Sequence, residues 1–126
     1  MKGAQQVAAS IAVKDMTVAA KFYEDVLELE KAAESPDGTY YKTGSSGIFV
    51  YPSTYAGTNQ ATYASWVVDD VDATVNDLKA KNVSFEQYDN LPGVSREGDV
   101  HVMGDLRAAW FKDPDGNILN IVNKIG

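Results

Sequence analysis

The sequence lacks cysteine altogether and contains one histidine, His101. Without cysteine there is no disulfide, no thiolate nucleophile and no thiolate metal site, and a single histidine excludes any site built on two imidazoles. No run of about 18 apolar residues occurs, so no segment is long enough to span a membrane as a helix. The first residues, MKGAQQVAAS, lack the apolar core of a signal peptide. We therefore expect a soluble, cytoplasmic protein.

Basic side chains are also scarce, with 11 against 18 acidic ones and a formal net charge of −7. An acidic surface repels phosphate backbones, so nucleic acid is not expected as a partner. Because no segment is long enough to span a membrane, no membrane partner is expected either. The chain has 126 residues, of which 44% are hydrophobic and 23% charged. These values predict a single globular domain that buries enough surface to fold without a covalent or metal staple.

The first half of the chain has a strand–helix–three-strand pattern. Asp15 is placed as an N-cap, and apolar residues recur from Met16 to about Leu27 at spacings of three and four, which predicts a helix. Turn-forming residues separate the other elements. The predicted strands are Val7–Val13, Leu29–Ala33, Thr39–Thr43 and Ile48–Tyr51.

The second half repeats this order of elements. Asp70 precedes a helical pattern that ends at Asn82, a residue type that tolerates the left-handed conformation at a helix end. An Asp-Pro-Asp-Gly sequence at Asp113–Gly116 suits a type I turn between the last two strands. The predicted strands are Thr62–Val68, Val83–Tyr88, Arg107–Lys112 and Ile118–Asn123.

The two halves align as an internal repeat. The first strand and helix match the second set at a shift of 55 residues, and the closing hairpins match at a shift of 70. The difference places an insertion at Asp89–Leu106, which is rich in Gly, Asp, Asn and Pro and is expected to be a long loop. We therefore predict an α+β fold of two tandem βαβββ modules in one domain, module one at about 5–55 and module two at about 60–124.

Three segments resemble the vicinal oxygen chelate superfamily, also called the glyoxalase/bleomycin resistance/dioxygenase fold. They are Ile11–Leu27, Trp66–Val71 and Trp110–Ile118. The resemblance implies a cup-shaped mixed sheet with helices outside, in proteins that range from dioxygenases and isomerases to drug binders. Glu28 departs from the glycine that the family usually has after the first helix.

The resemblance also implies where a metal would be held in the enzymes of the family: at Ala8, Val50, Tyr63 and Asn120. Alanine and valine have no donor atom, a neutral phenol is a poor ligand, and one amide oxygen supplies no charge. We therefore expect no metal and no cofactor.

Strand alternation predicts which side chains line the cup. Tyr40 and Trp110, equivalent by the shift of 70, are candidates for two aromatic walls, and a polar end is expected from the Tyr63 hydroxyl and the Asn120 amide. For Tyr63 and Asn120 the alternative is a purely structural role in the core. The full set of candidate ligand-binding residues is Ala8, Ser10, Tyr40, Val50, Tyr63, Ser65, Met103, Trp110 and Asn120.

Three ionisable residues are candidates for catalysis: His101 and Glu86 as general bases and Arg107 as a partner for an oxyanion. For His101 the competing interpretation is an ordinary surface residue in a loop.

Three functions remain open. The first is a metal-free protein that binds a small apolar or aromatic molecule, of the resistance or sequestration type. The second is a metal-independent, glyoxalase-like isomerase or lyase that abstracts a proton next to a carbonyl. The third is a dimeric interaction module, because the uncharged, tyrosine-rich stretch Thr43–Val68 has the composition of an interface core. A homodimer is expected and is compatible with all three.

Overall fold

The structure is a computed structural model that describes residues 1–125. The chain divides into two compact units. The first contains residues 1–63 together with Pro114–Asn117, and the second contains residues 64–113 and the segment that begins at Ile118. Within residues 1–125, no helix has both the length and the apolar composition needed to cross a bilayer.

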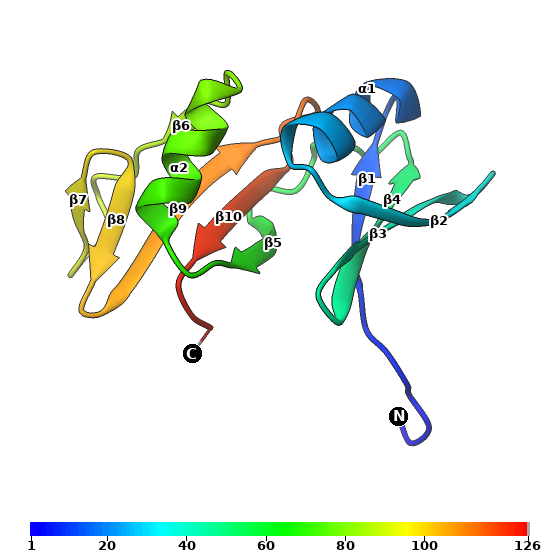
Figure 1. Ribbon diagram of the computed structural model, residues 1–126, viewed down its shortest axis with the longest axis horizontal. Coiled ribbons are helices and arrows are strands. Elements are labelled where there is room, and N and C mark those ends of the chain that lie inside the picture. The colour runs from blue at the N-terminus through cyan, green and yellow to red at the C-terminus, as the bar shows by residue number, and fades with distance from the viewer. Residues whose placement is uncertain (126) are drawn as a thin grey trace. The chain divides into compact units, whose positions relative to one another are not determined.

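The first unit is a four-stranded sheet with one helical segment (Figure 1). The order across the sheet is β1-β4-β3-β2, with β1 and β4 parallel and the other neighbours antiparallel. The strands are β1 (Ala9–Val13), β2 (Glu30–Ser35), β3 (Gly38–Thr43) and β4 (Ser46–Pro52).

The helical segment of this unit has two parts. Asp15 caps α1 (Met16–Ala20), accepting hydrogen bonds from the backbone N–H groups of Thr17 and Val18, as its position predicts. The chain then continues as a π-helical turn, η1 (Lys21–Val26). The prediction of one regular α-helix to about Leu27 is therefore wrong in its second half, since the Leu27 N–H bonds to the carbonyl of Phe22, five residues back.

The core of the first unit lies between this helical segment and one face of the sheet. Tyr23 of η1 is 0% exposed and stacks on Tyr41 of β3, with ring centroids 5.9 Å apart. The fully buried Ile11, Val13 and Val50 lie on the same sheet face as Tyr41, because neighbouring strand residues in register share a face. The opposite face of this sheet carries no helix of its own unit.

The second unit repeats the arrangement on a larger sheet. The strand order is β5-β10-β9-β8-β7, and β6 also pairs with β9. Helix α2 (Val71–Ala80) begins at the N-cap Asp70 and packs Val71, Val75 and Leu78 inward. The strands are β5 (Thr62–Val67), β6 (Phe85–Glu86), β7 (Ser95–Glu97), β8 (Val100–Met103), β9 (Leu106–Lys112) and β10 (Ile118–Val122).

The insertion does not form a long loop. Strands β7 and β8 make an antiparallel hairpin, and β8 continues the sheet by pairing with β9, so that His101 lies opposite Ala108. Gly98 and Gly104 adopt positive φ angles of 64° and 60° at the two turns, where each is followed by aspartate. The predicted loop at Asp89–Leu106 is therefore wrong over most of its length, because the same Gly and Asp residues form tight turns between strands.

Candidate functional site

The two faces of the second sheet differ in what covers them. Phe111, Ala109, Leu119 and Ile121 are buried on the face that packs against α2. Side chains alternate along a strand, so the residues between them lie on the other face, which we call the helix-free face of the second sheet. By the observed register it carries Leu106, Ala108 and Trp110 of β9, Asn120 and Val122 of β10, His101 and Met103 of β8, and Glu86 of β6.

Three rings lie in mutual contact on this face and form what we call the ring cluster: Tyr88, His101 and Trp110. The ring centroids of His101 and Trp110 are 4.9 Å apart and those of Tyr88 and Trp110 are 5.4 Å apart, both edge to face. The His101 and Tyr88 centroids are 5.7 Å apart. Burial, with a smaller contribution from the nearby Glu86 carboxylate, raises the pKa of the Tyr88 hydroxyl. Tyr88 is therefore neutral, and the cluster presents uncharged aromatic surface.

His101 is not a surface residue, because only 2% of it is exposed. Its Nε2 accepts a hydrogen bond of 2.9 Å from the backbone N–H of Tyr88, which assigns the proton of the neutral ring to Nδ1. Nδ1 is buried and has no hydrogen-bond partner among residues 1–125. His101 therefore offers a donor and has no free lone pair, which does not suit the general-base role considered for it.

Asn120 presents a second buried polar atom without a partner. It lies opposite Trp110 in the β9–β10 pair and is 6% exposed. Its Oδ1 accepts no hydrogen bond within the described part of the chain. Unsatisfied buried polar atoms are rare and each costs about 1–3 kcal/mol. Both such side-chain atoms found in residues 1–125 thus lie on the helix-free face, on residues that contact or pair with Trp110.

A hollow of about 430 Å³ adjoins these residues at one end of the helix-free face. Ala108, which is 4% exposed, separates it from Trp110 along β9. Met103, exposed over 49% of its surface, provides apolar lining. The hollow is lined by Ser65, Met103, Asp105, Leu106, Val122, Lys124 and Ile125.

Four of the predicted ligand-binding residues therefore belong to one face of one unit. Ser65 and Met103 line the hollow, and Trp110 and Asn120 lie along the sheet from it. Tyr63 lies on β5 two residues before Ser65, on the same face of the strand, and is half-buried. Tyr63 belongs to the first unit, whereas the ring cluster belongs to the second.

The remaining catalytic candidates are not brought to His101 as a group. Arg107 lies on the opposite face of β9, where it forms ion pairs of 2.9 Å with Asp72 and 2.8 Å with Glu97, and both acidic partners raise its pKa. Glu86 does lie on the helix-free face, but it pairs with Lys112 at 3.4 Å. The structure therefore assembles no acid–base group from these three residues.

In the first unit, the predicted orientation of Val50 is wrong. It pairs with Thr39 and Ile11 on the face that packs against the helix, and it is 0% exposed. The turn between β9 and β10 is one residue longer than the turn between β3 and β4, as the pairs Lys112–Ile118 and Lys42–Gly47 show. The shift of 70 thus becomes 71 on the last strand, and a slip of one residue reverses the face of every side chain.

The other candidates in the first unit keep their predicted face. Ser10 is exposed, and Ala8, just before β1, is half-buried. Both lie on the face of the sheet opposite to that of Ile11. Tyr40 shares that side, and its hydroxyl accepts a hydrogen bond of 2.6 Å from Gln6. The residue that pairs with both Ser10 and Tyr40 is Phe49, which stacks on Tyr51 at 6.1 Å. Counting alternate residues from Ile11, together with the β1–β4 register, places Phe49 and Tyr51 on this face.

The residues at the family's metal positions do not fit a metal ion. The register replaces Val50 by Phe49 in that set, and a phenylalanine ring has no donor atom. Ala8 also has none, which leaves one phenol and one amide, a set without a charged ligand. Within residues 1–125 no three His, Cys, Asp or Glu side chains gather closely enough to hold a metal.

One contributor to the ring cluster, Tyr88, was not predicted. It follows β6, and its backbone N–H orients His101 while its ring contacts both partners. The sequence signal was weak, because Tyr88 lies at the end of a predicted strand and its partner His101 lies in a segment predicted to be a loop.

Two tandem units, each a helical segment packed on one face of a sheet with the other face free of helix, define an α+β protein. A family model described as the Glyoxalase/Bleomycin resistance protein/Dioxygenase superfamily matches residues 5–121. The chain belongs to this superfamily.

Solved structures support the same fold. The chain is similar to TnmS3, an antibiotic binding protein from Streptomyces sp. CB03234, with 22% identity over 96% of each chain and a TM-score of 0.68. It is also similar to the oxidase ChaP-H2, with 20% identity, coverage of 98% of this chain and 95% of that one, and a TM-score of 0.72. A lactoylglutathione lyase from Agrobacterium tumefaciens has 17% identity, coverage of 97% and 94%, and a TM-score of 0.67. No curated protein is a significant match to the chain.

Proposed function

We propose that this protein binds a small aromatic molecule on the helix-free face of the second sheet, without a metal ion, in a resistance or sequestration role. The observation that carries the proposal is the juxtaposition of an apolar hollow, a ring cluster and two buried polar atoms without partners. The similarity to an antibiotic binding protein from Streptomyces also supports the proposal that this protein binds a small molecule.

The two polar atoms define the chemistry of the ligand. His101 Nδ1–H is a donor and Asn120 Oδ1 is an acceptor, and both flank Trp110. A planar ring that carries a carbonyl and an N–H or O–H satisfies both atoms, and each aromatic contact adds about 0.5–1.5 kcal/mol beyond area burial. Both atoms are covered in the free protein, so the ligand enters from the hollow as the rings of the cluster shift.

The proposal is tested with two probes of similar size. 2-Quinolone carries an adjacent C=O and N–H, whereas naphthalene carries neither. Titration of each probe into the protein, followed by tryptophan fluorescence and by the indole N–H resonances, measures the affinity. We expect saturable binding of 2-quinolone that perturbs the Trp110 indole resonance, and weaker binding of naphthalene.

Matched variants locate the binding site. Leu106→Ser removes an apolar side chain from the hollow, and we expect it to weaken 2-quinolone about tenfold, which is the loss of one buried apolar contact. Leu91→Ser makes the same change at a leucine that is 42% exposed and does not line the hollow, and it serves as the control. Asn120→Leu should weaken 2-quinolone while leaving naphthalene unchanged. The absence of saturable binding, or equal effects of the two leucine variants, would refute the proposal.

We also propose that the protein forms a homodimer through the uncharged stretch Thr43–Val68. Tyr55 in this stretch is 75% exposed, and exposed tyrosine without neighbouring charge is typical of interface cores. Light scattering tests the proposal: we expect a dimer for the natural chain and a shift toward monomer for Tyr55→Asp. A monomer at all concentrations would remove it.

A further inference from the structure

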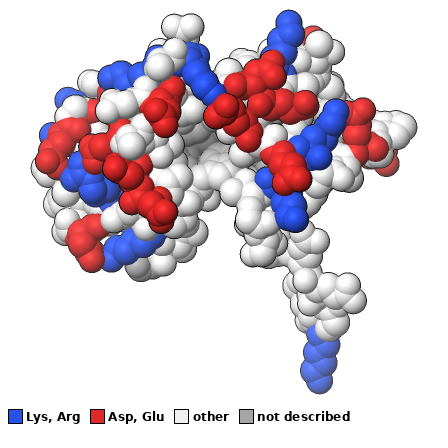
Figure 2. All heavy atoms as spheres, in the orientation of Figure 1, with Lys and Arg blue, Asp and Glu red and all other residues white. Residues whose placement is uncertain are grey.

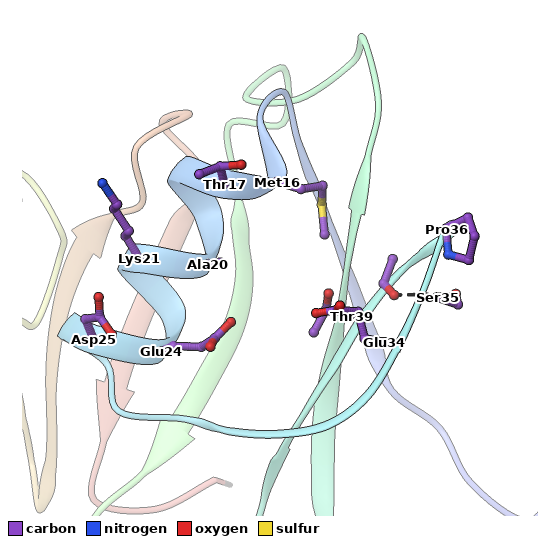
Figure 3. A pocket seen from close by; sticks show the side chains of 11 residues that line it. Met16, Thr17, Ala20, Lys21, Glu24, Asp25, Glu34, Ser35, Pro36 and Thr39 are labelled. Carbon is purple, nitrogen blue, oxygen red and sulfur yellow. Dashed lines mark hydrogen bonds between the residues drawn. The ribbon is translucent and has the colours of Figure 1, made fainter.

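A second recess lies in the first unit, far in sequence from the ring cluster and made by different elements. It is an open groove of about 520 Å³ between the helical segment α1–η1 and the hairpin of β2 and β3, here called the helix–hairpin groove (Figure 3). It is lined by Met16, Thr17, Ala20, Lys21, Glu24, Asp25, Glu34, Ser35, Pro36, Gly38 and Thr39.

The groove carries an excess of negative charge. Glu24, Asp25 and Glu34 contribute carboxylates, and Lys21 is the one basic residue of the lining. Figure 3 shows Glu24 reaching from the helix toward Thr39 and Glu34 on the hairpin, whereas Lys21 projects from the other side of the helix. The corner between Glu24, Glu34 and Thr39 is therefore acidic.

Thr39 gives the groove a polar atom in its floor. It is 4% exposed and lies on the buried face of β3, opposite Val50. Its hydroxyl makes no hydrogen bond within residues 1–125, and the residue lines the groove. Because this hydroxyl is not one of the two fully buried atoms without a partner, it is open to the groove and can hydrogen-bond a molecule there.

Glu24 is held in position while keeping one oxygen available. The Tyr41 hydroxyl donates a hydrogen bond of 2.7 Å to its Oε2. Burial, and then the contact with Glu24, raise the pKa of Tyr41 far above its ordinary value, so this hydroxyl stays a donor at all working pH values. Glu24 is part of the π-helical turn η1, a rare element that is frequent at functional sites.

We propose that the helix–hairpin groove binds a small organic ammonium ion, with the charged nitrogen between Glu24, Glu34 and Thr39 and the alkyl chain along Met16, Ala20 and Pro36. An ammonium group donates three hydrogen bonds, which matches two carboxylates and one hydroxyl. The apolar side chains in the rest of the lining contact the hydrocarbon part. This site is independent of the function proposed for the ring cluster.

One resident cation competes for the same carboxylates. Lys31 on β2 forms an ion pair of 2.9 Å with Glu34, and its side chain is 43% exposed. Its hydrogen bond to Glu34, followed by the charges of Glu34 and Glu24, raises the pKa of Lys31, so it is fully charged. With Lys31 included, three carboxylates face two lysines near the groove, and the balance stays negative. An ammonium ligand must displace the Lys31 side chain from Glu34.

The experiment is an NMR titration of the protein with n-butylammonium chloride, with potassium chloride at equal ionic strength and 1-butanol as reference titrations. So small a probe binds in the millimolar range at best. We expect saturable shifts at Thr39, Glu24 and Met16 with butylammonium and none with either reference. The absence of saturable shifts, or equal shifts with 1-butanol, would overturn the proposal.

Variants test the individual contacts. Thr39→Val keeps the shape and removes the hydroxyl, and it should weaken the probe about fivefold, the value of one hydrogen bond. Glu24→Gln should weaken it about tenfold, because a charged acceptor is lost. Lys31→Gln should strengthen it about two- to fivefold by removing the competitor.

Two control variants make the same chemical changes outside the groove. Thr43→Val acts at the far end of the same strand, and Glu30→Gln at an exposed carboxylate on β2; neither should alter the affinity. Amide spectra that retain the dispersion of the natural protein show that each variant folds. If Lys31→Gln weakens the probe, or if Thr43→Val matches Thr39→Val, the assignment is wrong.

Discussion

The outer edges of strands β3 and β9 are built differently in the two units. In the first unit β2 runs beside β3 along the whole strand, and all six residues of β2 are exposed. In the second unit two short strands share the corresponding edge: β6 covers Trp110 and Phe111, and β8 covers Leu106 to Ala108. Figure 1 shows β7 and β8 continuing this sheet outward.

This difference accounts for the location of the candidate site. The inserted hairpin delivers the chain's one histidine to the sheet beside Trp110, and the chain that leads into the hairpin supplies Tyr88. The equivalent residue of the first unit, Tyr40, instead receives a hydrogen bond from Gln6. The chemistry that distinguishes the units therefore comes from an insertion, not from the repeat.

The charged side chains visible in Figure 2 mix both signs over the surface without a basic patch in this view.

The hairpin turns differ as well, and this difference gives the largest expected effect on stability. The first turn, around Ser45, is exposed, whereas Asn117 of the second is 0% exposed. Asn117 donates to the carbonyl of Ala12 at 2.8 Å and accepts from the N–H of Gly57 at 3.3 Å. Asn117→Ala leaves both backbone groups unsatisfied, and we expect a loss of about 2–4 kcal/mol in the free energy of unfolding.

Chemical denaturation at neutral pH measures this loss, with Ser45→Ala as the control. Ser45→Ala should remain within about 0.5 kcal/mol of the natural protein, as surface changes usually do. Equal stability of the two variants would show that the two turns are equivalent, contrary to the structure.

A smaller effect is expected where the inserted hairpin is attached. Asp99 accepts hydrogen bonds from Lys79 of α2 at 2.7 Å and from Gln87 at 3.2 Å. Both partners, Lys79 first, hold the pKa of Asp99 below its ordinary value. Asp99→Asn should cost about 1–2 kcal/mol at pH 7, as for a largely buried charged hydrogen bond.

The pH dependence of this loss has a definite sign. The folded-state pKa lies below that of the unfolded chain, so the stabilisation is complete above the unfolded value of about 3.9 and is lost as the pH falls through the folded value. Denaturation curves from pH 7 to pH 3 should therefore converge for Asp99→Asn and the natural protein. Asp89, whose pKa Arg96 lowers but which is exposed, is the matched control, and Asp89→Asn should change little. A constant difference at all pH values would contradict the assignment.

The repeat and its helix starts could be predicted from the sequence because they depend on local chemistry. Asp15 and Asp70 both cap helices, as the position of an acidic residue before an apolar period indicates. Asn82 adopts a φ of 67° at the end of its helix, as expected for asparagine. The family and the α+β class followed from this pattern and are confirmed.

The predictions that failed depend on pairing between distant segments. The face of Val50 was wrong because a one-residue difference between two turns reverses the alternation, and the repeat alone does not show it. The inserted hairpin was missed because Gly98 and Gly104 were interpreted as loop residues, not as tight turns. The surface position considered as the alternative for His101 is wrong for the same reason. In the π-helical turn after Ala20, Tyr23 stacks against Tyr41, a contact between segments far apart in sequence.

The ends of the two helical segments give the smallest expected effect and compare the units most directly. Both end with a residue at positive φ: Glu28 at 56° and Asn82 at 67°. A side chain with a Cβ atom costs about 1–2 kcal/mol in this conformation, and asparagine recovers part of it by local hydrogen bonds. Glu28→Gly should therefore raise the stability by about 0.5–1 kcal/mol, after the entropy cost of glycine is subtracted, whereas Asn82→Gly should change it little. Thermal unfolding of both variants measures the difference in stability. An equal gain at the two positions would contradict the prediction, because it would show that glutamate and asparagine are equally strained at these helix ends.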